Sequence, residues 1–142
     1  MAWIALIAWV VTALGGFVLL SIWVSRGGMQ SAREAGSRIR PPLILSHFAL
    51  AAIGLVLWII YVATDSDALA WIAFVLLLVV AVLGFTMFGI WWRRRQQGAA
   101  AQAVDPAMPA EQHFPVVIVG GHGVLAATTL VLVFLATIGV GS

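Results

Sequence analysis

The chain has no cysteine, no lysine and few charges of either sign. Without cysteine there is no disulfide, no thiolate nucleophile, no iron–sulfur cluster and no covalent c-type haem attachment. Without lysine there is neither a P-loop lysine nor a Schiff base. Charged residues are only 8% of the 142 residues, whereas an average soluble domain has about 25%. This composition excludes a soluble globular enzyme, and its apolar content excludes intrinsic disorder.

Apolar residues are instead abundant, at 63% of the chain with a mean hydropathy of +1.12. They form four runs without Asp, Glu, Lys or Arg, at about 2–24, 43–63, 68–92 and 116–140. Each is long enough to cross a bilayer, which takes about 20 helical residues. Helices are expected because lipid offers backbone groups no hydrogen-bond partner. We therefore predict an all-α integral membrane four-helix bundle, with residues 1–142 as a single membrane domain and no internal repeat.

The arginines predict how the helices are oriented. All seven lie in the segments 25–42 and 93–115, whereas the turn at 64–67 holds only Asp65 and Asp67 as charged residues. By the positive-inside rule the two arginine-bearing segments are cytoplasmic loops, so both termini lie outside. This fits a multi-pass protein of a bacterial plasma (inner) membrane, and it explains the basic charge without nucleic-acid binding.

Two histidines inside the apolar runs are the main candidates for chemistry. His47 and His122 lie about 10 Å along their helices from Arg40 and Pro115, at about 1.5 Å per residue. Both helices enter from the cytoplasmic side, so the imidazoles should lie at similar depth. A haem iron can be held between two helices by one neutral imidazole from each. We predict that His47 and His122 bind one haem b, with cytoplasmic arginines pairing its propionates.

The neighbours of these histidines are small. Glycines at 120, 121 and 123 surround His122, and His47 shares a helix face with Ala51 and Gly54, which would leave space for a flat macrocycle. Small residues also line ordinary contacts between membrane helices. The alternative is that both histidines are structural groups hydrogen-bonded to neighbouring helices.

A weaker candidate for a metal site lies at the cytoplasmic rim, where Glu111 and His113, with or without His47, would be the ligands. Three such ligands would suit zinc. The other interpretation is an interfacial His113 that caps the entrance of the last helix beside Glu111. We find no Ser/His/Asp set and no paired carboxylates, so no motif indicates a hydrolase or transferase. The runs also lack the carboxylates and broken helices common in ion-coupled carriers.

Three short motifs resemble those of di-histidine b-type cytochromes of the cytochrome b561 plan: Ser46-His47-Phe48, His113-Phe114-Pro115 and Gly121-His122-Gly123. The resemblance implies a haem b inside a helical bundle that exchanges electrons with a quinone or a protein partner. A two-haem pattern needs four histidines, and this chain has three, so at most one haem fits. The chain is thus expected to be a single-haem electron carrier. The alternative is a non-catalytic accessory subunit that packs against a larger membrane complex or against itself.

Overall fold

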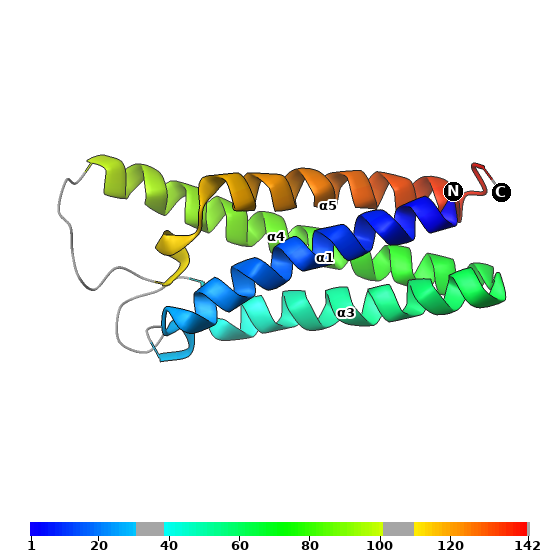
Figure 1. The fold of residues 1–142 in the computed structure, drawn as a ribbon, viewed down its shortest axis with the longest axis horizontal. Coiled ribbons are helices and arrows are strands. Elements are labelled where there is room, and N and C mark those ends of the chain that lie inside the picture. Colours follow the sequence, from blue (N-terminus) through cyan, green and yellow to red (C-terminus); the bar gives the residue numbers. More distant parts are fainter. Residues whose placement is uncertain (31–38, 101–109, 142) are drawn as a thin grey trace.

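The computed structural model describes residues 1–30, 39–100 and 110–141. Four long helices account for most of them: α1 (Ala2–Ser25), α3 (Pro41–Thr64), α4 (Asp67–Ala100) and α5 (Val116–Thr137). A short 3-10 helix, η1 (Ala110–His113), precedes α5. No strand occurs in the described ranges. The predicted all-α four-helix bundle is confirmed (Figure 1).

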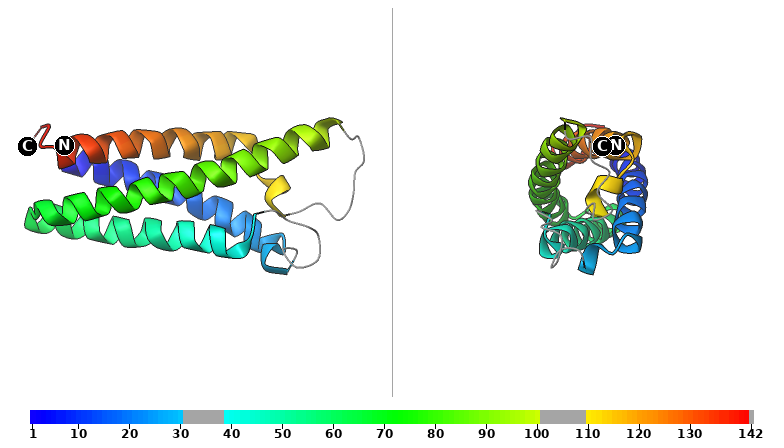
Figure 2. Two further views of the ribbon diagram at one scale, coloured as in Figure 1. Left: turned by 180° about the vertical axis from the view of Figure 1, so that it is seen from behind. Right: turned by 90° about the vertical axis from the view of Figure 1, so that its left-hand side faces the viewer.

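The four helices run alternately up and down and form a ring (Figure 2). The closest packing is between α3 and α4 and between α1 and α5; α1 also packs on α3, and α4 on α5. Consequently α1 lies diagonally opposite α4, and α3 opposite α5. The Met1 amino group donates to the Gly141 carbonyl at 3.0 Å, so both ends of the described chain meet at one end of the bundle, the termini end. Arg26, Arg40 and Arg93 lie toward the other, the arginine end.

Local chemistry explains where the helices begin and end. Pro41 follows an extended Arg40, and Val116 follows an extended Pro115, so both helices that enter from the arginine end begin at a proline-bearing boundary. Asp65 ends α3 in the left-handed conformation, with φ 52°. Helix α4 continues past the apolar run to Ala100, because arginine, glutamine and alanine are good helix formers.

All four helices are long and apolar enough to cross a membrane. Large apolar side chains cover the outside of the bundle; Phe85, Val117 and Val124 are each more than two-thirds exposed. Because water would not tolerate such a surface, the lipid bilayer is the environment that this fold requires. The chain is a multi-pass membrane protein.

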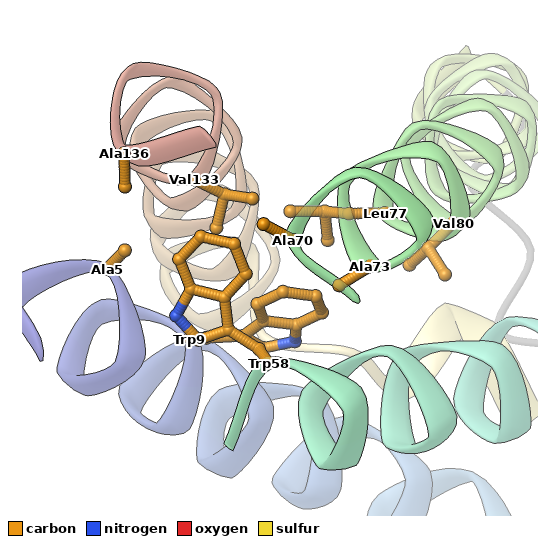
Figure 3. Close-up of a cluster of buried hydrophobic side chains, with 9 residues drawn as sticks. All are labelled: Ala5, Trp9, Trp58, Ala70, Ala73, Leu77, Val80, Val133 and Ala136. Atoms are coloured by element: carbon orange, nitrogen blue, oxygen red, sulfur yellow. The ribbon is translucent and has the colours of Figure 1, made fainter. Parts of the chain in front are cut away.

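The tightest core lies between the middle of the bundle and the termini end (Figure 3). Two indoles dominate it, Trp9 and Trp58, with ring centroids 6.3 Å apart. Gly54 makes room for Trp9, since a Cβ at Gly54 would lie 3.0 Å from Trp9 Cζ2. The remaining buried members come from α1, α4 and α5: Ala5, Ala70, Ala73, Leu77, Val80, Val133 and Ala136. This rigid half positions the site described next.

Candidate functional site: two imidazoles inside the bundle

The structure brings His47 and His122 together. They come from α3 and α5, which are diagonally opposite, and their rings meet in the interior with centroids 6.5 Å apart and planes at 67°. The sequence analysis predicted similar depth for the two rings, and the ring contact agrees with it. No other pair of histidine rings in the described residues makes such a contact.

Each imidazole is anchored by a backbone carbonyl of a neighbouring helix. His47 Nδ1 lies 3.0 Å from the Val80 carbonyl oxygen on α4, and His122 Nδ1 lies 3.0 Å from the Thr12 carbonyl oxygen on α1. A carbonyl only accepts hydrogen bonds, so Nδ1 must carry the proton and donate it. In the neutral ring this leaves Nε2 with a free lone pair. Both tautomers are therefore fixed in the form that a metal ligand needs.

The Nε2 atoms themselves make no hydrogen bond within the described part of the chain. Both histidines are half-buried although their rings point into the bundle. In each ring, Nε2 is therefore the nitrogen that the described contacts leave for a ligand.

Glycines seat the two rings, but they are not the glycines that the sequence analysis chose. A Cβ at Gly16 would lie 3.0 Å from His122 Cε1, and a Cβ at Gly84 would lie 3.2 Å from His47 Cε1. Gly15 also lies beside His122. The predicted neighbours at 120, 121 and 123 are exposed, with nothing within 4 Å of an added Cβ. That prediction was wrong because a residue next to His122 in sequence points around the helix, away from its ring.

Gly54 is likewise not beside His47, although both lie on the inward side of α3; it receives Trp9. The sequence reasoning also missed Thr12 and Val80, whose carbonyls hold the histidines. The sequence does contain a signal for these glycines, because Gly16 and Gly84 each belong to an Ala-x-x-Gly-Phe sequence.

A second contact between α1 and α5 lies beside the Thr12 carbonyl that His122 contacts. Thr12 Oγ1 donates to the Ala8 carbonyl at 2.8 Å and lies 2.9 Å from Thr129 Oγ1. Because the Thr12 proton is used on Ala8, Thr129 is the donor to Thr12. Thr129 is 1% exposed. Thr12 therefore contacts α5 through both its carbonyl and its hydroxyl.

The weaker candidate for a metal site concerns Glu111 and His113. Among the described residues no three His, Cys, Asp or Glu side chains are grouped so as to hold a metal ion. Glu111 is 0% exposed within η1, whereas His113 at the end of the same short helix is exposed, so the two residues lie in different surroundings. Two residues of the same short helix thus differ in burial, with Glu111 buried and His113 exposed. The described residues therefore give no support to the predicted zinc site of Glu111 and His113, with or without His47, which stays a prediction.

The predicted arginine partners of haem propionates are only partly described; Arg33 and Arg38 lie outside the described residues. Arg93 and Arg94 line a cavity of about 360 Å³ on α4, together with Phe85, Gly89 and Gln97 among others. The Arg95 guanidinium lies over the Trp91 ring, 5.5 Å from its centroid. The pairing of arginines with propionates stays a prediction.

Comparison with protein-family models, curated proteins and solved structures found no match to this chain. The resemblance to di-histidine cytochromes is therefore carried by the three short motifs alone.

Proposed function

We propose that the protein is a membrane electron carrier that holds one haem b between His47 and His122. The observation that carries the proposal is the donor set: two imidazoles from opposite helices whose rings meet in the bundle interior, each held through Nδ1 by a backbone carbonyl. An imidazole at membrane depth is costly to maintain, so two that meet there point to a function.

The separation of the rings fits a shared metal ion. With about 2 Å for each metal–nitrogen bond and about 1 Å from nitrogen to ring centre, imidazoles on opposite sides of one metal lie about 6 Å apart. The observed centroid separation is 6.5 Å.

Haem b would supply one-electron redox chemistry at this site. The protein's part is to hold the ligands. The Val80 and Thr12 carbonyls fix the tautomer and orientation of the rings, and such a bond also makes Nε2 a better donor. The Trp9–Trp58 core closes the bundle toward the termini end. With one pair of histidines the chain carries one haem, so electrons would be exchanged at the arginine end with a quinone or a protein partner.

The test is an absorbance spectrum of protein purified from haem-replete cells. We expect a Soret band, lost in His47→Ala and in His122→Ala while size-exclusion and helical circular dichroism profiles are retained. His113→Ala is the matched control and should keep the band. A colourless protein that also fails to take up added haemin would overturn the proposal. So would an unchanged band in both variants.

The accessory-subunit alternative is supported by the same hydrogen bonds, because each imidazole ties two helices together and needs no ligand to be satisfied at Nδ1. It predicts association through small-residue faces with a membrane partner or a second copy. A protein that is monomeric in mild detergent and captures no membrane protein on cross-linking would count against it.

A further inference from the structure

The first and third long helices share a sequence pattern. Aligned at a constant offset of 68 residues, α1 and α4 share Ala-Trp-Ile-Ala at 2–5 and 70–73, Ala-x-x-Gly-Phe at 13–17 and 81–85, and Ile-Trp-x-x-Arg at 22–26 and 90–94. An unbroken offset through the whole helix is not expected of two unrelated apolar segments, whose similarity would be confined to composition.

The second and fourth long helices are related in the same way. At an offset of 75 residues, α3 and α5 share His-x-x-Leu-Ala-Ala-x-x-Leu-Val-Leu, at 47–57 and 122–132. The two histidines are equivalent positions in this alignment. The expectation of a chain without an internal repeat is therefore wrong: a unit of two helices occurs twice.

The structure repeats with the sequence. Every residue from 3 to 19 agrees with the residue 68 positions later in being buried, half-buried or exposed, and every residue from 42 to 59 agrees in the same way with the residue 75 positions later. Ala5 and Ala73 are both 0% exposed, and so are Trp58 and Val133. The packing also obeys a twofold relation, because exchanging α1 with α4 and α3 with α5 exchanges the α1–α5 contact with the α3–α4 contact.

The histidine contacts are the clearest expression of this symmetry. His47 of the first unit donates to Val80 and sits against Gly84, four residues further along the second unit's α4. His122 of the second unit donates to Thr12 and sits against Gly16, again four residues further along α1. Val80 and Thr12 are equivalent at the 68-residue offset. Each unit therefore provides one imidazole and the seat for the other unit's imidazole.

We infer that the binding centre is a twofold site made by two copies of one two-helix unit, with Gly16 and Gly84 as equivalent positioning residues, and that its ligand is a metal centre that would take one imidazole from each unit. This inference rests on the proposed function for the identity of the ligand. The reciprocal seating of the imidazoles is independent of it.

Steric distances explain why glycine is needed at both seats. An added methyl group would approach Cε1 of each imidazole to 3.0 Å at Gly16 and 3.2 Å at Gly84, closer than ordinary van der Waals contact. The ring would have to move by a few tenths of an ångström, away from the carbonyl that orients it. Loss of such orientation typically lowers metal affinity by about 10- to 100-fold.

The test compares Gly16→Ala and Gly84→Ala with Gly89→Ala and Gly120→Ala, whose added methyl groups meet nothing within 4 Å. The first readout is nitrogen NMR of ¹⁵N-histidine in haem-free protein, with His113 as internal reference. Wild-type His47 and His122 should both be Nδ1-protonated. Gly16→Ala should shift the His122 signals alone and Gly84→Ala the His47 signals alone, and both controls should match wild type.

The second readout is haem affinity and the low-spin spectrum. We expect each seat variant to lose about tenfold or more in affinity, by similar factors, with unchanged affinity in the controls. If wild-type protein binds no haem, the proposed function fails but the NMR result still decides the reciprocal seating. An Nε2-protonated tautomer at either wild-type histidine would overturn the inference, as would a seat variant that leaves its imidazole signals unchanged. The tautomer measured in wild-type protein tests the reciprocal seating of the imidazoles even if a glycine variant does not fold.

Discussion

The hydroxyl pair of Thr12 and Thr129 provides a quantitative test of how α1 and α5 are joined beside the site. Both residues are buried, at 8% and 1% exposure, and their oxygens are 2.9 Å apart. A hydrogen bond in a folded protein contributes about 0.5–1.5 kcal/mol net, and bonds between membrane helices average about 0.6 kcal/mol with a maximum near 1.7. Because water is excluded from this pair, we expect the upper part of that range, about 1 kcal/mol.

Valine is the matched substitution, since it keeps the shape of threonine and removes the hydroxyl. Thr129→Val removes the donor while Thr12 keeps its bond to the Ala8 carbonyl, so we expect a loss of about 1 kcal/mol. Thr12→Val leaves the Thr129 hydroxyl free to turn to a carbonyl of its own helix, which reduces the cost. The double variant should be about as stable as the less stable single variant.

The assay is a double-mutant cycle from reversible unfolding in mixed micelles. Thr128→Val is the control: Thr128 bonds the Val124 carbonyl of its own helix and is exposed, so its loss should change stability by less than about 0.5 kcal/mol. A coupling energy near zero, with both single variants destabilised, would show that the two hydroxyls do not bond. The reasoning about the α1–α5 contact would then be refuted.

Three further predictions concern packing, topology and lipid. Gly54→Ala should destabilise the protein by about 1–3 kcal/mol in the same unfolding assay, because the new methyl group would lie 3.0 Å from the buried Trp9 ring; an unchanged stability would contradict this packing. In this cysteine-free chain, Ser66→Cys and Gln97→Cys should react with an impermeant maleimide from opposite sides of the membrane, Gln97→Cys from the cytoplasmic side; labelling of both from one side would contradict the topology. Arg93→Gln should weaken the binding of phosphatidylglycerol to the protein in mixed micelles by about fivefold, since an arginine near an anionic headgroup contributes about 1 kcal/mol, and equal binding by variant and wild type would exclude that role.

The fold was predictable because lipid imposes a simple rule on sequence. A helix must satisfy its own backbone, so its length is visible as an uncharged run. Helix ends were less visible: the apolar run stops near Trp92, but α4 continues to Ala100 because helix propensity does not depend on hydrophobicity. Which helices pack together was not predictable from the runs. Small and large apolar residues occur on every face, and lipid-facing and buried stripes look alike.

The site was predictable in part, for a different reason. His47 and His122 could be chosen because polar groups are rare in lipid, and their depth followed from helical rise. The seats could not be chosen, because Gly16 and Gly84 act from other helices and nothing in the sequence near a histidine identifies them. Backbone carbonyl acceptors such as that of Val80 have no sequence signature at all. The internal repeat was the available signal, since equivalent glycines in equivalent helices imply equivalent contacts.

The duplicated architecture also explains why the imidazoles are anchored to backbone. A side-chain partner for each histidine would add a further polar group at membrane depth, with its own cost. A helix carbonyl has a second lone pair that is free even when it accepts the bond within its own helix. An imidazole can reach this lone pair if the residue four positions after the carbonyl is small. Gly16 follows Thr12 and Gly84 follows Val80 at this spacing. One glycine per unit therefore lets one imidazole reach a backbone carbonyl, and duplication of the unit brings two imidazoles into contact inside the bundle.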